Sequence, residues 1–457
     1  MIEKELPPEL AVALEARDFP ALKEIFTRID HHDVAATIEE MPEEDRVIPF
    51  RLLPYDVAAD VFEYISPETQ ESLIKNLGQD QAARILNEMS ADDRTDLLEE
   101  LPSAVTRQIL QMLSVEERRH AVTLLGYPEE SIGRLMTPDY VAIRENWTVQ
   151  QALDFIRSNG KDSETLNVVY VTGERGKLLA EARIRFLLLA DPEAKIADIT
   201  DDYFISLQAW DDQEKSVAVF EEYDRVALPV TDSRNNLLGI VTIDDVLDVA
   251  REEATEDIQK MGGTEALDDP YIDAGFLHMF RKRVGWLVLL FIGQLLTLNA
   301  IAVFEKEIMS AMVLVLFLPL IISSGGNSGS QAATLIIRSL ALEEVHLKDW
   351  FRVLGREILS GLALGAVIAS LGFLRIFAGG TAAFGPDWPL LGLTIAVSLI
   401  GVVLWGSLVG SMLPFIMQRL GADPAASSTP FVTTVVDVTG LLFYLLVASL
   451  MLQGTFL

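Results

Sequence analysis

The sequence predicts a multidomain membrane protein with four parts: an all-α helical-repeat N-domain, an α/β tandem domain pair, a connecting helix, and an all-α transmembrane domain with five spans. Three observations predict this architecture. A short motif recurs at intervals of 23 or 24 residues near the N-terminus, a helix–strand–turn–strand–helix pattern then occurs twice, and long apolar segments fill the C-terminal part. About 20 apolar residues cross the hydrocarbon core of a bilayer. A chain of 457 residues is long enough for several domains.

The N-terminal repeat covers residues 33–125, and each unit holds a helix, a turn and a second helix. The units begin at Asp33, Asp56, Asp80 and Ala104, and the second helices begin at Ser66, Ser90 and Ser114. A serine followed by acidic residues is a typical helix start. Apolar residues recur at helical spacing, so we expect a stack of helical hairpins. Such a stack is either a scaffold that binds a partner or a packed regulatory domain.

Residues 136–250 change character, with strands expected near 167–172 and 227–232 and helices between them. The doubled pattern resembles a tandem pair of CBS domains. The second copy carries Thr242 and Asp245, a Thr-x-x-Asp motif that lies near phosphate and ribose in CBS pairs that bind nucleotides. The first copy has Phe186 in place of this aspartate. The departure argues against adenine-nucleotide binding by the first copy, and ATP is only weakly supported as a ligand of the pair.

Residues 246–261 form one acidic amphipathic pattern that should end near Gly262 and Gly263. Such a helix would connect the soluble part to the membrane part and could transmit movement between them. The alternative is a passive, solvated linker. We therefore expect the N-domain at 1–130, the CBS pair at 131–250, the connecting helix at 251–275 and the transmembrane domain at 276–457.

The net charge of −32 is unevenly distributed. From Val284 onward there are nine acidic and seven basic residues, which leaves 59 acidic and 29 basic residues in 1–283. A polyanion would be repelled, so nucleic acid is excluded as a partner. An acidic domain beside a pore could instead gather divalent cations, although ordinary acidic solubility is the alternative. The chain has no cysteine, which excludes disulfides and thiolate metal sites, and its five histidines lack zinc-type spacing.

Five membrane spans are expected at roughly 284–304, 310–337, 354–378, 390–418 and 428–453. Basic residues flank them unevenly. Eight lie on the side of the N-terminus and two on the other: Arg281, Lys282, Arg283, Arg338, Lys348, Arg352, Arg356 and Arg419 against Lys306 and Arg375. The positive-inside rule then predicts a multi-pass protein of the cell membrane, in contact with lipid, with a cytoplasmic N-terminus. The N-terminal residues lack the basic and apolar regions of a cleaved signal peptide.

A single carboxylate, Asp437, lies inside the last apolar segment. An ionised aspartate at this depth costs several kcal/mol unless a partner charge, water or a cation offsets it. The other apolar segments carry no lysine or arginine in their middle, which points to a cation pathway. The alternative is a protonated, structural aspartate that is hydrogen-bonded to a neighbouring helix.

The second span contains a run of small and amide residues from Ser323 to Gln331. We expect this run to be a poor membrane helix, with irregular backbone and free carbonyls beside a wet cavity. Asn327 and Gln331 add neutral oxygens. Hard cations prefer oxygen ligands, and magnesium gives up its waters reluctantly, so such a pore would hold a hydrated ion. The alternative is tight helix packing through small residues.

The Gly-Gly-Asn-x-Gly-x-Gln segment at 325–331 and the Asp-Val-Thr-Gly-Leu-Leu segment at 437–442 together resemble the MgtE family of magnesium channels, and the resemblance extends over the whole chain. It implies a homodimer with the ion path along the dimer axis. Asp437 matches the family's pore carboxylate and Asn327 a pore-lining asparagine. Thr429 stands where the family usually has asparagine, so selectivity or conductance would differ.

The resemblance also implies a cytoplasmic magnesium sensor that closes the pore. The implied ligands are acidic residues of the N-domain, the second CBS domain and the connecting helix: Asp92, Asp93, Asp212, Glu214, Asp224, Asp245, Asp248, Glu253, Glu256 and Asp257. Bound Mg²⁺ would bridge these carboxylates and hold the domains compact, and its loss would let like charges push them apart. Taken singly, each of these acids is better explained as a plain surface charge; their clustering and the family pattern favour the sensor.

The leading interpretation is therefore a magnesium-selective channel that takes up Mg²⁺, with Mn²⁺, Co²⁺ and Ni²⁺ as further candidate ions. The alternative is a secondary transporter of divalent cations driven by a sodium or proton gradient, like the solute-carrier relatives that share the membrane motif but generally lack CBS domains. An enzyme is not supported, because the chain has no P-loop, no nucleophile elbow and no histidine-based metal site.

Overall fold

The computed structural model describes residues 12–453 except 14–15, 17, 27, 44, 202, 268–270, 273, 311 and 343. Its contacts divide the chain into two compact units, Met1–Ala250 and Arg251–Leu457. Helix α16 (Ile243–Met261) begins in the first unit and ends in the second. It contains the acidic pattern expected at 246–261, and it ends where the two glycines were predicted to stop it.

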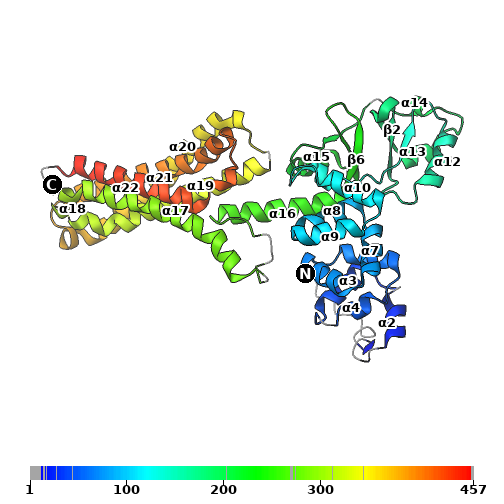
Figure 1. The fold of residues 1–457 in the computed structure, drawn as a ribbon. Coiled ribbons are helices and arrows are strands. Elements are labelled where there is room, and N and C mark those ends of the chain that lie inside the picture. Colours follow the sequence, from blue (N-terminus) through cyan, green and yellow to red (C-terminus); the bar gives the residue numbers. More distant parts are fainter. Residues whose placement is uncertain are drawn as a thin grey trace. The chain divides into compact units, whose positions relative to one another are not determined.

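The N-domain is helical, as predicted, and its repeated units are the hairpins α5–α6, α7–α8 and α9–α10 (Figure 1). Its helices are α2 (Phe19–Phe26), α3 (His31–Glu40), α4 (Val47–Phe50), α5 (Tyr55–Glu63), α6 (Pro67–Asn76), α7 (Gln79–Glu88), α8 (Ala91–Glu100), α9 (Ser103–Met112) and α10 (Val115–Leu124). The hydroxyls of Ser90 and Ser114 cap α8 and α10 as expected. Ser66 occupies the N-cap of α6, but its hydroxyl donates to Thr69 Oγ1 at 3.3 Å instead of accepting a bond from a helix-start N–H.

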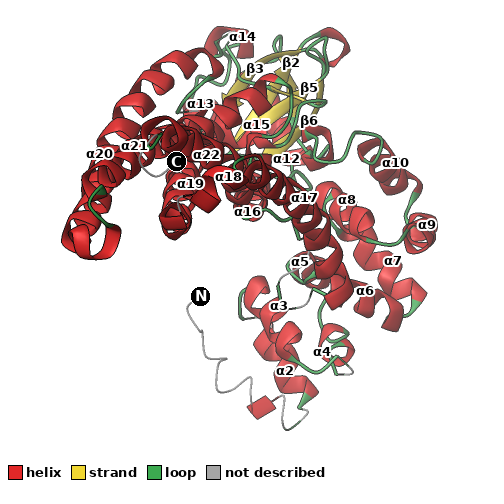
Figure 2. Cartoon of the chain, turned by 90° about the vertical axis from the view of Figure 1, so that its left-hand side faces the viewer, coloured by secondary structure: helices red, strands yellow, loops and turns green. Residues whose placement is uncertain are grey.

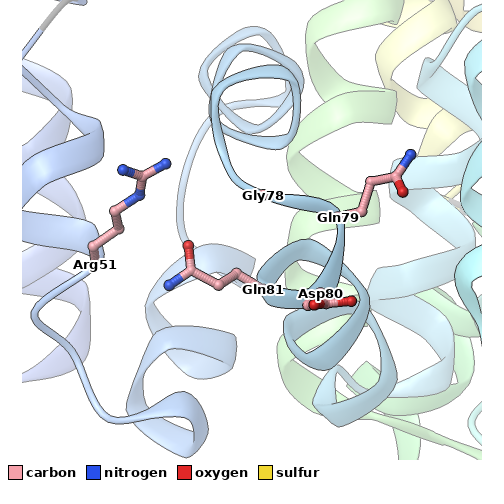
Figure 3. A pocket seen from close by; sticks show the side chains of 5 residues that line it. All are labelled: Arg51, Gly78, Gln79, Asp80 and Gln81. Carbon is pink, nitrogen blue, oxygen red and sulfur yellow. The ribbon is translucent and has the colours of Figure 1, made fainter.

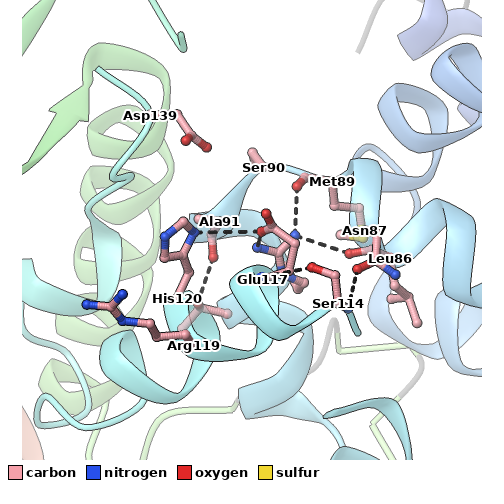
Figure 4. A network of polar contacts seen from close by, with 12 residues as sticks. Leu86, Asn87, Met89, Ser90, Ala91, Ser114, Glu117, Arg119, His120 and Asp139 are labelled. Carbon is pink, nitrogen blue, oxygen red and sulfur yellow. Dashed lines mark hydrogen bonds and ion pairs between the residues drawn. The ribbon is translucent and has the colours of Figure 1, made fainter. Parts of the chain in front are cut away.

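One hydrogen bond recurs every 24 residues and joins successive hairpins. Each is donated by the backbone N–H of an N-cap serine: Ser66 to Glu39 Oε1 at 2.6 Å, Ser90 to Glu63 Oε1 at 3.0 Å and Ser114 to Asn87 Oδ1 at 2.6 Å. Figure 4 shows Ser114 and Asn87, the residues of the last of these bonds. The acceptor always lies at or near the end of the helix three elements before the one that the serine caps: α3 for α6, α5 for α8 and α7 for α10. This bond satisfies a helix-start N–H and fixes how each hairpin sits on the one before it.

A buried arginine reinforces the last of these joints. Arg94 is fully buried, donates to the carbonyls of Leu86 at 3.1 Å and Met89 at 2.9 Å, and pairs with Glu117. His120 Nδ1 lies 3.8 Å from the same Glu117 carboxylate (Figure 4). The guanidinium therefore ties α8 to α10, next to the acidic first turn of α8.

The CBS pair consists of two three-stranded sheets of the same topology (Figure 2). The strands are β1 (Ala142–Arg144), β2 (Val168–Thr172), β3 (Leu178–Arg183), β4 (Leu207–Gln208), β5 (Ala227–Thr231) and β6 (Leu237–Thr242). In each sheet the first pair is parallel and the second antiparallel. The accompanying helices are α11 (Ile132–Leu135), α12 (Val149–Asn159), η1 (Glu174–Gly176), α13 (Ile184–Leu189), α14 (Ile196–Ile199), α15 (Glu214–Tyr223) and the start of α16.

The duplicated topology places Arg183 and Phe186 where the second copy has Thr242 and Asp245. Both pairs lie at the step from the last strand of a sheet into the following helix. Phe186 is about half exposed, whereas the Thr242 hydroxyl donates to Asp245 Oδ2 at 2.6 Å. The first copy therefore lacks the hydroxyl–carboxylate pair, as the sequence indicated.

The second unit contains five helices long and apolar enough to cross a membrane within the described residues, and this number agrees with the prediction. Its elements are α17 (Phe276–Val303), α18 (Glu305–Ser310), η2 (Met312–Phe317), α19 (Leu318–Ala341), η3 (Leu347–Asp349), α20 (Trp350–Phe384), α21 (Trp388–Arg419), η4 (Pro424–Ala426) and α22 (Thr429–Met451). Helix α19 packs against α21 and α22, and α20 packs against α21. Several of these helices extend beyond the expected spans.

One sequence prediction about this unit is wrong. Residues 323–331 are helical throughout, inside α19, so they do not release their backbone carbonyls. Small residues let α19 approach α21 closely instead: a Cβ added to Gly406 would lie 2.4 Å from the Gly325 oxygen, and one added to Gly410 would lie 2.1 Å from the Gly329 oxygen. The alternative interpretation, tight packing of small residues, therefore explains the glycines of this run.

Candidate functional site

Helix α22 presents a polar stripe that ends at the membrane aspartate. Thr429, Thr433 and Asp437 are spaced four residues apart, which places them on one face of the helix. All three are half-buried. The Thr433 hydroxyl donates to the Thr429 carbonyl of the same helix at 2.9 Å. The stripe therefore starts at the first residue of α22 and runs into the segment that sequence analysis singled out.

Asp437 faces α19 across a glycine. A Cβ added to Gly326 would lie 3.3 Å from Asp437 Oδ1 and 2.9 Å from Thr433 Cγ2. Ser330, one turn further along α19, shares a hydrogen bond of 2.9 Å with Thr433. No hydrogen bond or ion pair to the Asp437 carboxylate is formed among the residues that the structure describes. The protonated aspartate bonded to a neighbouring helix therefore finds no support within the described part of one chain.

Helix α19 carries a second polar stripe. Ser323, Asn327 and Gln331 are also spaced four residues apart, and all three are exposed in the single chain. Asn327 Nδ2 donates weakly to Ser323 Oγ at 3.3 Å. Polar side chains within membrane spans almost always face a bundle interior or a water-filled cavity rather than lipid. The stripe, which adjoins Gly326 and hence the Asp437 face, therefore needs water or another chain beside it.

In the first unit, acidic residues from three segments face one another. Asp92 and Asp93 begin α8, Asp245 begins α16, and Glu63 ends α5. Asp92 is 8 % exposed, and its Oδ1 is buried with no hydrogen-bond partner among the described residues. Asp93 Oδ2 accepts a bond of 2.5 Å from the Ser90 hydroxyl. An orphaned buried carboxylate oxygen is the kind of ligand that a hard cation takes.

The electrostatics of this acidic cluster follow from burial and mutual repulsion. Burial raises the pKa of Asp92, and the negative charges of Asp245 and Asp93 raise it further. Burial likewise raises the pKa of Asp245, although the hydrogen bond from Thr242 opposes the shift. The pKa of Glu63 rises from its usual 4.5 to about 8, through burial and then the charge of Asp93. Without a cation these carboxylates disfavour one another's ionised forms.

Besides Glu63, sequence analysis missed two further acids of the cluster, Glu164 and Asp244. Burial raises the pKa of Glu164, and the charges of Asp244 and Asp93 add to the rise. Burial also raises the pKa of Asp93, and the charges of Asp244 and of Asp248, a predicted ligand, raise it further. Glu63 could have been found from the repeat, since it stands at the same place as Glu39, 24 residues earlier. Glu164 lies on a loop of the first CBS copy and carries no motif that would reveal it.

Three other predicted ligands, Asp212, Glu214 and Asp224, lie at the two ends of α15 and do not form one site. Asp212 and Glu214 lie at the start of α15, where Asp212 Oδ1 accepts the Glu214 N–H at 2.9 Å. Asp224 caps the other end of this ten-residue helix in a left-handed conformation. A helix of that length spans about 15 Å, so Asp224 and the first two residues cannot hold the same ion. Asp224 instead lines a cavity of about 460 Å³ beside α16.

The predicted ligands of the connecting helix lie in the second unit. Glu253, Glu256 and Asp257 share one face of α16, three and four residues apart. Glu256 pairs with Lys260 at 2.5 Å. Burial raises the pKa of Asp257, with the nearby Asp423 as the next cause. Asp257 therefore lies near Asp423, in the segment that precedes α22, and is partly buried there.

Within the described part of one chain, no three histidine, aspartate or glutamate side chains are grouped closely enough to hold a metal ion by themselves. A hollow of the N-domain does not supply such a site either. It has a volume of about 480 Å³, lies at the start of α7, and is lined by Arg51, Gly78, Gln79, Asp80 and Gln81 (Figure 3). None of these is a predicted ligand.

Comparison with known families matches each part of the chain. The family model described as "Divalent cation transporter" (MgtE) matches residues 318–447, the MgtE intracellular N domain matches 29–130, and the CBS domain matches 132–180 and 211–252. The first CBS match ends before Phe186, where the first copy departs from the motif. Two solved structures match the soluble part, each with a TM-score of 0.51: the cytosolic domain of the Mg²⁺ channel MgtE in complex with ATP (36% identity, 53% of this chain, 98% of that one) and the soluble part of a magnesium transporter (32% identity, 54% and 96%).

Curated relatives match over nearly the full length. The magnesium transporter MgtE of Thermus thermophilus is 38% identical over 456 residues, which cover 99% of this chain and 100% of that protein. Its namesake in Enterococcus faecalis is 35% identical and covers 98% of each chain, and that of Bacillus subtilis is 32% identical, with 95% and 94% covered. Identity at this level across all domains shows the family, and the chain therefore belongs to the MgtE family of multi-pass magnesium transporters.

Proposed function

We propose that this protein is a magnesium-selective channel that mediates Mg²⁺ uptake, works as a homodimer and is closed by Mg²⁺ bound to its soluble part. The observation that carries the proposal is the pair of polar stripes, Ser323–Asn327–Gln331 on α19 and Thr429–Thr433–Asp437 on α22. The second stripe lies against Gly326, which directly precedes Asn327 in α19. The two stripes offer hydroxyls, amides and one carboxylate without a protein cation among the described residues. Hydrated Mg²⁺ binds such oxygens through its waters and keeps its octahedral shell.

The exposure of the α19 stripe supports the proposed homodimer. In one chain, Asn327 and Gln331 are exposed on a membrane-spanning helix. A second copy related by a two-fold axis would enclose both stripes and place two Asp437 carboxylates around a shared path. Two facing carboxylates strengthen the demand for a cation, because the second is hard to ionise next to the first without one.

Selectivity would come from the size and hydration of the ion. A path lined by Asp437, Asn327 and Thr429 would contact the water shell of the ion rather than the bare ion. We therefore expect Mn²⁺, Co²⁺ and Ni²⁺ to compete with Mg²⁺, because they also favour octahedral oxygen and nitrogen ligands. The Thr429 hydroxyl is shorter than the asparagine amide usual in the family, so it would contact the hydrated ion less closely.

The acidic cluster supplies the proposed regulation. Asp92 and Asp93 come from the N-domain, and Asp245 and Asp248 from the start of α16. A bound Mg²⁺ would offset the repulsion that raises their pKa values and would hold the N-domain against the second CBS copy. Since α16 continues into the second unit, the occupancy of this cluster biases the helix that leads to the pore.

The soluble part would then face the cytoplasm, in accord with the basic residues that flank the spans. ATP occupies the cytosolic domain of one solved relative. This chain keeps Thr242 and Asp245 in its second copy but has Arg183 and Phe186 in its first. We therefore expect ATP to bind more weakly here than at a pair with the motif in both copies.

The decisive experiment is Mg²⁺ flux into liposomes that contain the purified protein, with Asp437→Ala as the variant. The proposal expects flux down the Mg²⁺ gradient, inhibition when millimolar Mg²⁺ bathes the soluble part, and loss of selectivity in the variant. Flux that requires a sodium or proton gradient would show that the protein is a secondary transporter and not a channel. Unchanged selectivity in Asp437→Ala would make Asp437 structural.

The regulatory part has its own variant. Neutralising two acids of the cluster, with Asp245→Asn and Asp248→Asn together, should raise the Mg²⁺ concentration that inhibits flux while the selectivity of the pore stays that of the wild type. An exposed acid outside the cluster, changed by Glu116→Gln, is the matched control. Inhibition that is unaltered in the double variant would remove the cluster from the mechanism.

A further inference from the structure

The C-terminal end of α16 is joined to the segment between α21 and α22 by a lysine that bridges two carboxylates. Lys260 Nζ lies 2.5 Å from Glu256 Oε1, in its own helix, and 2.8 Å from Asp423 Oδ2. The other oxygen of Asp423 accepts the Ala425 N–H at 2.7 Å and so caps η4, the short helix directly before α22. One carboxylate thus both receives the lysine and shapes the start of the pore helix.

Apolar contacts beside the bridge fix the same two segments together. Met261 packs against a buried cluster that includes Ala425 of η4, Val432 and Val436 of α22. Gly263 is buried with φ of +76°, and a Cβ there would lie 2.7 Å from Trp286 Nε1 and 3.1 Å from Pro430 Cγ. The end of α16 therefore meets the first turns of α22 through Lys260, Met261 and Gly263 in succession.

A hydrogen bond extends this junction to the first membrane helix. Trp286 of α17 donates through Nε1 to Ser428 Oγ at 3.2 Å, and Ser428 is the N-cap of α22. The turn after α16 is held as well, because Gln259 accepts the Leu267 N–H at 2.6 Å through Oε1. Displacement of the α16 end would consequently strain the start of α22 rather than be absorbed by a loose linker.

The charges at this junction depend on the lysine. Glu256, Asp257 and Asp423 bring three carboxylates together, and Lys260 is the ammonium that contacts two of them. Burial alone would lower the pKa of Lys260, but the bonds to Asp423 and Glu256 outweigh it and raise the pKa above its usual value of 10.5. Removal of the ammonium would leave carboxylates from two segments facing each other, and such like-charge contacts push segments apart.

We propose that Lys260 and Asp423 form a positioning latch that transmits the position of α16 to the start of α22, and hence to the Thr429–Thr433–Asp437 stripe. The inference rests on the proposed magnesium-regulated channel and names the contact that carries its regulation. The latch is a tethered cation, so it holds the junction at any Mg²⁺ concentration, and only the remote acidic cluster needs to respond to the ion.

The test is Mg²⁺ flux into liposomes by the full-length Lys260→Met variant, read as the ratio of flux with and without Mg²⁺ on the soluble side. Methionine keeps much of the apolar stem and removes the charge. We expect the Mg²⁺ concentration for half inhibition to rise at least fivefold. Lys75→Met, which breaks an exposed pair with Glu71 in the N-domain, is the matched control and should inhibit like the wild type. The charge-swapped double variant Lys260→Glu with Asp423→Lys should recover most of the inhibition.

A second measurement does not depend on how the swapped pair folds. The chain has no cysteine, so Lys260→Cys combined with Asp423→Cys can be joined by a short thiol-reactive cross-linker without background. Cross-linking should restore inhibition that the untreated double variant has lost. Wild-type inhibition in Lys260→Met, or no recovery on cross-linking, would overturn the latch alone. Flux of the wild type that Mg²⁺ never inhibits would overturn the proposed regulation and the latch with it.

Discussion

At the scale of single residues, Gly326 allows α19 to approach α22 closely at Asp437. Gly326→Ala would place a methyl group 2.9 Å from Thr433 Cγ2 and 3.3 Å from Asp437 Oδ1. The methyl must displace the Asp437 face of α22, because helical backbone on both sides leaves little room to yield. We expect Mg²⁺ flux to fall at least tenfold, with a loss of stability of about 1–3 kcal/mol from overpacking.

The control for this variant is Gly355→Ala in α20. A Cβ at Gly355 meets nothing within 4 Å, so the change adds a good helix former without a clash. Flux and melting temperature of both variants, measured in parallel, separate the local effect from a general intolerance of substitution. Equal flux in Gly326→Ala and the wild type would show that the close approach of α19 to Asp437 has no bearing on transport.

At the scale of elements, the bond that links successive hairpins predicts an effect on stability. Asn87→Ala removes the acceptor for the Ser114 N–H, and the amide also donates to the Ala83 carbonyl. A helix-start N–H left without its partner typically costs about 1–2 kcal/mol. Asn76→Ala, which removes only an exposed bond to Ser72 of its own helix, should cost less than about 0.5 kcal/mol.

Thermal unfolding followed by circular dichroism compares the two asparagine variants, and hydrogen exchange locates the change. Asn87→Ala should increase exchange in α9 and α10, because these helices lose the bond to the preceding hairpin. Identical melting curves for the two variants would mean that apolar packing alone holds the stack together.

The elements also show how far sequence reasoning reaches. The 24-residue repeat, the five apolar segments and the doubled strand pattern follow from periodicity, which local spacing encodes directly. The run from Ser323 to Gln331 was misread because glycine and serine have low helix propensity in isolation. Tertiary contacts stabilise the helical conformation of this run, because Gly406 and Gly410 of α21, which are far away in the sequence, lie against the backbone of Gly325 and Gly329.

Some residues of the candidate sites can be recognised from the sequence, whereas others are revealed only by the fold. Asp437 and Asn327 stand out because a polar group in an apolar segment is conspicuous. Glu164 and the Lys260–Asp423 pair could not be found, because a glutamate in a polar loop and a lysine on an acidic helix look like ordinary surface residues. Only the fold brings Asp423 to Lys260, across 163 positions of the chain.

At the scale of the whole molecule, the exposed stripe on α19 predicts how two copies meet. With Asn327→Cys in the cysteine-free chain, a thiol-reactive cross-linker should link two copies in the membrane, since Asn327 would lie near the two-fold axis. Leu371→Cys, on an exposed apolar face of α20, should face lipid and remain uncross-linked. Efficient dimers from Leu371→Cys, with none from Asn327→Cys, would place the dimer interface on α20 and remove the proposed ion path.

The whole molecule should also respond to pH through its acidic cluster. The folded pKa of Glu63 is raised from 4.5 to about 8, and those of Asp92 and Asp245 are raised as well. The folded protein therefore holds protons that the unfolded chain releases between about pH 4.5 and pH 8. In this window the free energy of unfolding falls as pH rises, which is opposite to the usual effect of salt-bridged carboxylates.

The measurement is the melting temperature of the full-length protein in EDTA at pH 5.5 and pH 8. We expect it to be lower at pH 8, by roughly 2–8 °C if the cluster contributes about 1–2 kcal/mol to a unit of this size. Glu63→Gln should reduce the difference, whereas the exposed Glu116→Gln should leave it unchanged. Mg²⁺ binds the ionised carboxylates, so by mass action it should raise the melting temperature more at pH 8 than at pH 5.5. Two outcomes would contradict this prediction: a melting temperature that rises with pH in EDTA, and a Mg²⁺-induced shift of equal size at both pH values. Either would mean that these carboxylates do not sense the metal and only take part in packing.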